Sequence, residues 1–142
     1  MNACNVLLVE DNTDDELLTQ RGLRKSGFDF GVVVARDGAA ALETITCMAT
    51  LPQLVLLDLK LPKIDGSEVL RRLRETERTL RLCVVVFTSS GEPRDIERCY
   101  GLGCNSYVIK PVAYEDYIAT VQRICDYWLM LNVSPLASEL PQ

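Results

Sequence analysis

Short apolar runs alternate with longer segments of helical spacing, and this alternation occurs five times along the chain. Runs such as residues 54–57 and 84–87 are apolar at every position, which is typical of parallel strands that helices cover on both faces. The repeated strand-then-helix order predicts an α/β fold with five βα units and a parallel sheet. The expected strands are residues 5–9, 31–35, 53–57, 82–87 and 106–109.

Helical spacing fills the segments between these runs. In the first expected helix, Leu17, Leu18 and Leu23 are expected to point inward. The last helix is the longest and carries one apolar stripe, formed by Tyr117, Ile118, Val121, Ile124, Cys125 and Trp128. The expected helices are residues 14–26, 38–47, 67–78, 92–102 and 113–131.

Neither a repeat nor an internal linker interrupts this pattern. We therefore predict one domain over residues 1–131, followed by a C-terminal tail over residues 132–142. Asn132 can cap the last helix, and Pro135 and Pro141 favour an extended tail.

Composition narrows the possible functions. The net charge of −5, from 15 Lys and Arg against 20 Asp and Glu, disfavours DNA binding, which draws its affinity from neutralised phosphates. The longest apolar run, residues 82–87, is far shorter than the about twenty residues that a membrane helix needs. The first residues lack the basic stretch and apolar core of a secretory signal. Six cysteines, with no C-x-x-C pair and no histidine, disfavour a zinc site. We expect a cytoplasmic protein with reduced cysteines that binds neither nucleic acid nor a membrane.

Polar residues stand directly after four of the expected strands. Glu10 and Asp11 follow the first strand, Asp58 the third, Thr88 the fourth and Lys110 the fifth. The carboxyl ends of parallel strands meet at one edge of a sheet, which is where open α/β sheets bind their ligands. A carboxylate after a buried strand is costly unless it meets a cation. The sequence therefore predicts a charged site at this edge.

Three further acids, Asp14, Asp15 and Glu16, open the first expected helix. Acidic side chains in a first helical turn interact favourably with the helix dipole. We therefore interpret these three as helix-stabilising residues that need no ligand.

The charged set suits phosphoryl chemistry. Carboxylate oxygens of Asp11 and Asp58 can hold Mg²⁺, a small hard cation that keeps several waters. Lys110 can neutralise a phosphoryl oxygen, Thr88 can donate a hydrogen bond to another, and Asp58 is the candidate nucleophile. The chain has no histidine, so a phosphohistidine donor would belong to another protein.

These residues resemble the receiver domain of two-component response regulators, over the chain to about Tyr127. The resemblance rests on the acidic pair after V-L-L-V, on Asp58 in L-V-L-L-D-L-K-L-P-K-I-D-G, on Thr88 in V-V-V-F-T-S-S and on Lys110-Pro111 in S-Y-V-I-K-P. It implies a flavodoxin-like, doubly wound sheet of strand order 2-1-3-4-5.

The resemblance also implies roles for single residues. Asp58 would be the phosphoacceptor. Mg²⁺ would be held by Asp11, Asp58 and the main-chain carbonyl of Lys60, with Glu10 acting through a metal-bound water.

On the opposite side of the implied site, Thr88 and Lys110 would bind phosphoryl oxygens. A cis Lys110–Pro111 bond would aim the lysine. Thr88 and Tyr107 would form the activation switch, although a strand aromatic such as Tyr107 can equally serve to cover the fourth helix.

Finer features are similar to stand-alone regulators that partner bacterial phytochrome histidine kinases: E-D-N-x-x-D near the start, A-R-D-G at 35–38 and the C-terminal D-Y-W-L. The implied function is that of a single-domain response regulator, which accepts a phosphoryl group from a sensor histidine kinase and signals through phosphorylation-dependent protein interaction. Such a protein catalyses only its own phosphorylation and dephosphorylation.

The end of the last expected helix predicts a homodimer. Its final turns are apolar on nearly every side, more than one domain of this fold can bury. The expected interface combines the fourth helix, the fifth strand and the fifth helix with Tyr127, Trp128, Leu129, Met130 and Leu131. The alternative is that this segment folds back over its own sheet edge.

Three other readings remain open at this point. A phosphatase of the haloacid-dehalogenase type needs a second acid two residues after Asp58, where this chain has Lys60. A flavodoxin-like cofactor protein needs a phosphate-binding loop where this chain has Glu10 and Asp11. A receiver-like scaffold that is never phosphorylated should lack part of the charged set, which is complete here.

Overall fold

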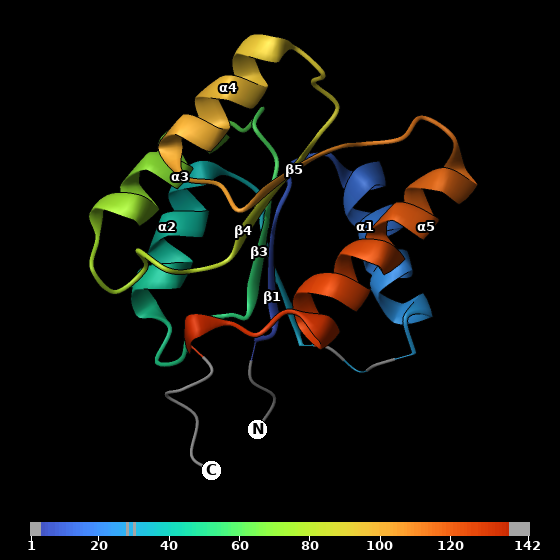
Figure 1. Cartoon of the computed structure of the whole chain (residues 1–142), viewed down its shortest axis with the longest axis horizontal. Helices are drawn as coiled ribbons and strands as arrows, with labels where there is room; N and C mark the ends of the chain where they lie inside the picture. Colours follow the sequence, from blue (N-terminus) through green and yellow to red (C-terminus); the bar gives the residue numbers. More distant parts are fainter. Residues whose placement is uncertain (1–3, 28, 30, 137–142) are drawn as a thin grey trace.

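The computed structural model describes residues 4–27, 29 and 31–136. In that part of the chain, five parallel strands form one sheet of order β2-β1-β3-β4-β5, as the family resemblance implied (Figure 1). The strands are β1 (Val6–Val9), β2 (Val32–Ala35), β3 (Leu54–Leu57), β4 (Val84–Thr88) and β5 (Ser106–Ile109). The helices are α1 (Thr13–Lys25), α2 (Gly38–Cys47), α3 (Gly66–Glu75), α4 (Pro93–Leu102) and α5 (Tyr114–Cys125), with a π-helix η1 (Asp126–Leu131).

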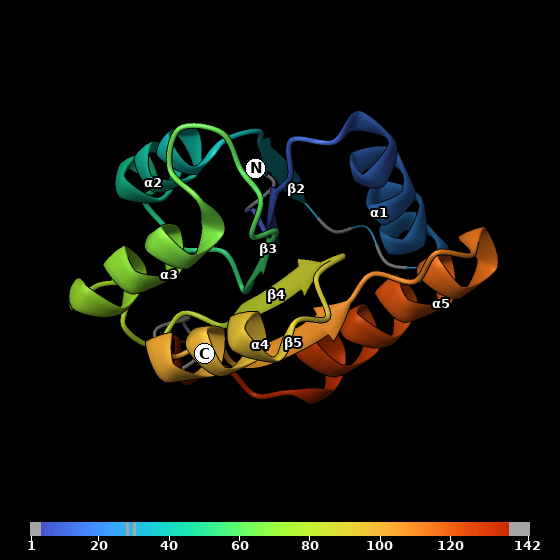
Figure 2. The same cartoon turned by 90° about the horizontal axis from the view of Figure 1, so that it is seen from above.

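The sheet lies between two helical layers: α1 and α5 cover one face, and α2, α3 and α4 cover the other (Figures 1 and 2). Alternate strand residues enter different cores. Leu7 and Val9 of β1 join the core under α2 and α3, whereas Val6 and Leu8 join the core under α1 and α5. Because both faces of the sheet are buried, the central strands are apolar at every position.

Leu17 was expected to point inward, but it is 57% exposed. The buried face of α1 instead includes Glu16 and Thr19. Glu16 pairs with Arg36 at 3.0 Å, and Thr19 is hydrogen-bonded to Tyr117 at 2.9 Å. Apolar periodicity placed Leu18 and Leu23 correctly but was wrong for Leu17, because polar side chains with buried partners form part of the inner face of α1.

The C-terminal segment does not leave the domain as an extended arm over its described part. From η1, residues 132–136 pass below the sheet, at the end where the strands begin (Figure 1). Trp128 packs against the core under α1 and α5, whereas Leu136 packs against the opposite core. The remainder of the predicted tail, residues 137–142 with Pro141, lies outside the described residues. No helix in the described part of the chain is long and apolar enough to cross a membrane.

Candidate functional site

Three carboxylates meet at the carboxyl edge of the sheet. Glu10 and Asp11 follow β1, and Asp58 follows the adjacent β3, whose register aligns Val9 with Leu57. One ligand oxygen from each of the three side chains lies within 4.8 Å of the others. Glu10 and Asp58 are buried and Asp11 is exposed, so the cluster opens to solvent on one side.

Lys110 reaches this cluster from the end of β5. Its Nζ donates hydrogen bonds to Glu10 Oε1 at 2.6 Å, to Asp15 Oδ2 at 2.8 Å and to Asp58 Oδ2 at 3.0 Å. The lysine side chain is only 5% exposed. One ammonium therefore faces the carboxylates of Glu10, Asp11, Asp15 and Asp58, and the site carries an excess of negative charge.

Burial and ion pairing act in opposite directions on these groups. Burial raises the pKa of Glu10 to about 7, against the lowering effect of its hydrogen bond to Lys110. Burial alone would lower the pKa of Lys110, but its hydrogen bonds to Asp15 and Glu10 and the charge of Asp58 raise it above the ordinary value. Lys110 is thus a fixed cation in the site.

Asp15 is the site residue that sequence reasoning missed. We interpreted it with Asp14 and Glu16 as a helix-stabilising acid, and it does lie in the first turn of α1. Its carboxylate is also an ion-pair partner of Lys110, about 95 residues further along the chain. The sequence signal was only the closeness of Asp15 to the acidic pair after the first strand, since α1 begins at Thr13 and carries Asp15 in its first turn.

The remaining candidates lie around the cluster. Thr88 is fully buried at the end of β4, and its Oγ1 accepts a 3.4 Å hydrogen bond from the amide of Ser90. Tyr107 donates to the carbonyl of Ser90 at 2.8 Å and packs against the core under α4. Lys60 is exposed in the loop after β3. Thr88 at the end of β4 and Tyr107 in β5 thus both contact the β4–α4 loop at Ser90.

Gly66 holds the loop that carries Asp58. A Cβ at position 66 would stand 2.1 Å from the carbonyl oxygen of Asp58, a distance that no side chain allows. The amide of Gly66 donates to Leu59 at 2.8 Å, and Asp65 caps α3 by accepting from Glu68 at 3.0 Å. The D-G pair of the sequence therefore folds the β3–α3 loop tightly against the acceptor position.

The expected cis Lys110–Pro111 bond is absent: no peptide bond among the described residues is cis. Lys110 reaches the carboxylates with the trans bond, because β5 itself ends beside β4 and points the chain at the site. The bend was therefore not needed to aim the lysine.

Comparison with known families separates the receiver reading from the phosphatase and flavodoxin-like readings. The response regulator receiver domain matches residues 6–122. The chain belongs to the response regulator receiver family. The receiver is 43% identical over 134 residues to a probable methanogenesis regulatory protein, FilR2, of Methanothrix harundinacea. The matched residues make up 92% of this chain and 86% of that protein. It is 36% identical over 137 residues to the response regulator Rcp1 of Synechocystis sp., with 93% of each chain covered.

Solved receivers agree in fold and in the kind of site. The Mn²⁺-bound form of Rcp1 superposes with a TM-score of 0.85 at 36% identity, over 92% of this chain and 97% of that one. The phosphorylated cyanobacterial phytochrome response regulator RcpA gives 0.88 at 35%, over 94% and 99%. The receiver domain of the sensor histidine kinase PA1611 of Pseudomonas aeruginosa, with magnesium in its active-site cleft, gives 0.73 at 30%, over 89% and 98%.

This receiver is a response regulator, a phosphoacceptor signalling protein with an acidic phosphorylation pocket of Glu10, Asp11 and Asp58. The donor set of this pocket fits a divalent metal. Clustered carboxylate oxygens are hard ligands, and the single ammonium leaves negative charge that a divalent cation can balance.

Proposed function

We propose that Asp58 is the phosphoacceptor of this receiver and that a partner histidine kinase supplies the phosphoryl group. The observation that carries the proposal is the meeting of Asp58 with a buried lysine and two further acids at one sheet edge. In the transfer, a carboxylate oxygen of Asp58 forms a bond to phosphorus while the phosphorus–nitrogen bond of the phosphohistidine breaks. The histidine nitrogen keeps the electron pair of the broken bond.

Lys110 and Thr88 act on the group that is transferred. The ammonium of Lys110, 3.0 Å from Asp58, is placed to neutralise a phosphoryl oxygen, and the hydroxyl of Thr88, which accepts from the Ser90 amide, keeps its own proton to donate to another. Mg²⁺ would be held by Asp11, Asp58 and the Lys60 carbonyl, with Glu10 acting through water. When bound, the ion neutralises phosphoryl oxygens.

The output of the receiver is a protein interaction that changes with phosphorylation. Thr88 and Tyr107 both contact the β4–α4 loop at Ser90, which gives the switch a structural basis. The net negative charge of this chain favours protein partners over nucleic acid. Its free cysteines, together with a kinase as phosphoryl donor, favour the cytoplasm. The similarity to phytochrome response regulators supports a bacterial phytochrome as the sensor kinase.

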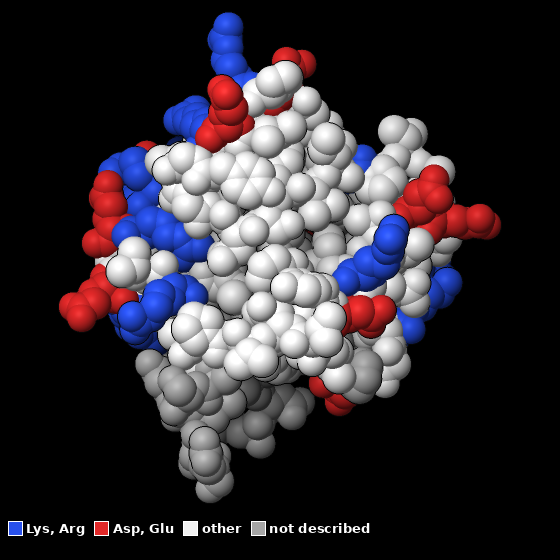
Figure 3. Space-filling model, in the orientation of Figure 1, with Lys and Arg blue, Asp and Glu red and all other residues white. Residues whose placement is uncertain are grey.

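A homodimer is the second part of the proposal. Trp128 and Leu129 are partly buried against their own core, so they offer less surface to a partner than the residues around them. Tyr127, Met130 and Leu131 remain 47%, 49% and 72% exposed. The face formed by α4, β5 and α5 carries few charged side chains (Figure 3), which suits a contact with a second copy.

Acetyl phosphate with Mg²⁺ tests the phosphoacceptor. Intact-mass measurement should show one added phosphoryl group on the wild type and on the control Asp116→Asn, whose carboxylate lies in the first turn of α5. Asp58→Asn should remain unmodified. Modification of Asp58→Asn would refute the assignment, and an unmodified wild type would favour the scaffold reading.

A further inference from the structure

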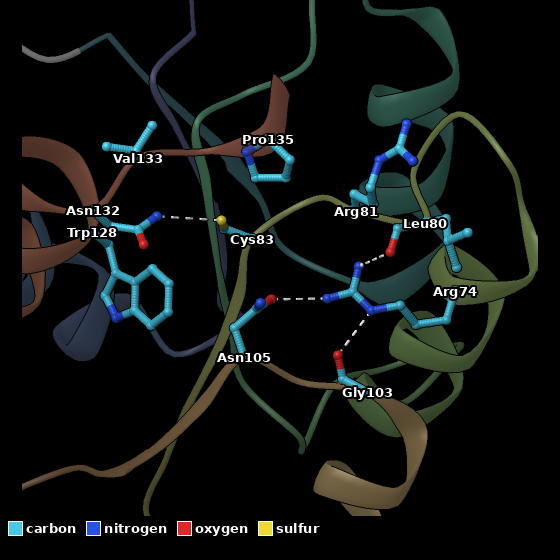
Figure 4. Close-up of a pocket in the computed structure, with 10 residues that line it drawn as sticks. All are labelled: Arg74, Leu80, Arg81, Cys83, Gly103, Asn105, Trp128, Asn132, Val133 and Pro135. Atoms are coloured by element: carbon cyan, nitrogen blue, oxygen red, sulfur yellow. Dashed lines mark hydrogen bonds between the residues drawn. The ribbon is translucent and has the colours of Figure 1, made fainter. Parts of the chain in front are cut away.

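A pocket of about 400 Å³ lies at the other end of the sheet from the acidic site. It is bounded by the residues just before β4 and β5, the end of α3 and the segment after α5 (Figure 4). Cys83 and Asn105 precede the two strands, and Lys110 is about 16 Å further along β5. Its volume is within the range of small-molecule sites, and the phosphotransfer reaction does not use it.

Arg74 is a fixed cation in this pocket. Its guanidinium donates to the carbonyls of Gly103 and Leu80 at 2.8 and 3.0 Å and to Asn105 Oδ1 at 2.9 Å (Figure 4), and also to the carbonyl of Thr79 at 3.2 Å. All these acceptors are neutral, and no carboxylate among the described residues forms an ion pair with Arg74. Burial lowers the pKa of this guanidinium, as expected for a cation without a compensating charge. The arginine is therefore pre-organised and electrostatically unbalanced.

A second arginine, Arg81, lies on the rim of the pocket. It is exposed and makes no hydrogen bond or ion pair with any residue that the structure describes. In Figure 4 its guanidinium extends away from Arg74, and an exposed side chain of this length can turn toward a bound anion. Lys and Arg side chains on the α3 side of the molecule are interspersed with Asp and Glu (Figure 3), so the attraction of this pocket for an anion rests on Arg74 and Arg81 themselves.

The opposite wall offers what a heterocyclic ring requires. Trp128 presents a partly exposed indole across the pocket from Arg74 (Figure 4). Asn105 uses its Oδ1 for Arg74 and for the amide of Val84, which leaves its Nδ2 as a donor. Asn132 uses its Nδ2 for Cys83 Sγ at 3.9 Å, which leaves its Oδ1 as an acceptor. An aromatic face, a donor and an acceptor can together bind a nucleobase.

We propose that this pocket binds a mononucleotide, with the phosphate between Arg74 and Arg81 and the base against Trp128. Arg81 can bind two phosphate oxygens with its guanidinium fork, whereas Arg74 contributes its charge and its one remaining N–H, because four of its five donors are already used. A carboxylate ligand without a ring would leave the indole and the two amides unused. The site is independent of Asp58, so the proposal stands apart from the proposed phosphotransfer.

Trp128 is the single tryptophan of the chain, so its fluorescence reports on this pocket directly. We would titrate the full chain with AMP, in EDTA to keep phosphate away from the acidic site, and excite where purines do not absorb. AMP should quench Trp128 saturably, whereas adenosine or inorganic phosphate alone should require much higher concentrations. Asp58→Asn should bind AMP like the wild type.

Two variants separate the pocket from a general charge effect. Arg81→Gln should weaken AMP binding about two- to fivefold, the range for an exposed ion pair. Arg94→Gln, which removes an equal charge from α4 outside the pocket, should leave it unchanged. Arg74→Gln should weaken it about tenfold or more, but it also removes four internal hydrogen bonds, so its fold is checked by circular dichroism.

The proposal fails if AMP causes no saturable quenching by about 5 mM, below which even millimolar sites are detected. It also fails if Arg94→Gln weakens binding as much as Arg81→Gln, or if inorganic phosphate alone binds as tightly as AMP. Each of these results is compatible with normal phosphorylation of Asp58, so it would leave the proposed function intact.

Discussion

Lys110 Nζ lies 3.0 Å from Asp58 Oδ2, so the lysine that follows β5 reaches across β4 to the aspartate that follows β3. The same ammonium binds Glu10 at 2.6 Å after β1. One cation thus links the ends of three strands of the sheet. The ion pairs of Lys110 therefore stabilise the arrangement of these strand ends and also fix the positions of the charged groups in the phosphorylation pocket.

Removing this ammonium should destabilise the fold. In Lys110→Met, Glu10 and Asp58 would face each other without a cation, which costs about 3 kcal/mol or more for a buried pair. Urea unfolding at pH 7 without metal measures this loss. Added Mg²⁺ should restore part of it, because the ion binds only the folded site.

Lys63→Met is the matched control for that substitution. Lys63 pairs with Asp37 at 3.6 Å, but its side chain is 69% exposed. The control should lose less than about 1 kcal/mol. Equal losses in the two variants would mean that the buried ion pairs of Lys110 contribute nothing special.

Metal dependence should reside in Asp11. This carboxylate is exposed and is not an ion-pair partner of Lys110, so Asp11→Asn should leave the fold intact while weakening Mg²⁺ binding. The Mg²⁺ concentration that half-saturates phosphorylation by acetyl phosphate should rise about tenfold or more, because one charged ligand is lost. EDTA should abolish phosphorylation in the wild type. An unchanged Mg²⁺ requirement in Asp11→Asn would exclude it as a ligand.

The sequence predicted the five strands and the main site residues from local patterns, whereas the strand order followed from the family resemblance. Continuous apolar runs mark buried parallel strands, and the residue after each run must lie at the carboxyl edge. Glu10, Asp58 and Lys110 were found in this way, and the structure brings them within hydrogen-bond reach of one another.

What the sequence did not show depends on contacts between distant segments. Asp15 has the ordinary helix-dipole role of a first-turn acid, and only the fold brings Lys110 to it. Leu17 is exposed, whereas Glu16 is buried on the inner side of α1. Burial of this carboxylate is possible because Arg36, in the loop after β2, forms an ion pair with it. The pocket near Trp128 was not foreseen, since it is built by four segments that no local pattern connects.

Cysteine reactivity should follow burial. Burial raises the pKa of Cys99 to about 11 and that of Cys125 to about 12, because the thiolate is disfavoured away from water. At pH 8, iodoacetamide should therefore alkylate the exposed Cys47 and spare these two thiols until the protein is unfolded in urea. Peptide mass spectrometry measures the ratio. Alkylation of Cys125 as fast as Cys47 would contradict the buried environment.

The same shifts set a direction for stability at high pH. In the unfolded chain these thiols lose their protons near the ordinary value of 9.0, whereas in the native state they keep them to about 11 and 12. Their contribution is complete below pH 9 and is lost as the pH rises through the native values. The urea midpoint should fall above pH 9.

Two glycines offer a matched pair for testing the contact between α1 and α5. A Cβ at Gly22 would stand 2.6 Å from Val121 Cβ, whereas a Cβ at Gly101 in α4 would meet nothing within 4 Å. Gly22→Ala should lower the free energy of unfolding by about 1–3 kcal/mol through overpacking. Gly101→Ala should raise it by about 0.5–1 kcal/mol through helix propensity. Urea denaturation of both variants measures the difference, and equal effects would mean that the helices can move apart freely.

The proposed homodimer can be separated from the folding of α5. Truncation before η1 would remove Trp128 and Leu129 from the core, so a point substitution on the exposed side is the sharper test. Leu131 is 72% exposed, and Leu131→Glu should leave the monomer folded. A carboxylate placed unpaired in an apolar interface costs about 3 kcal/mol or more, which weakens the dimer over a hundredfold. Light scattering should give about twice 15.9 kDa for the wild type and 15.9 kDa for this variant. Val112→Glu, at a fully exposed position before α5, should remain dimeric. A wild type that is monomeric with and without beryllofluoride would refute the dimer.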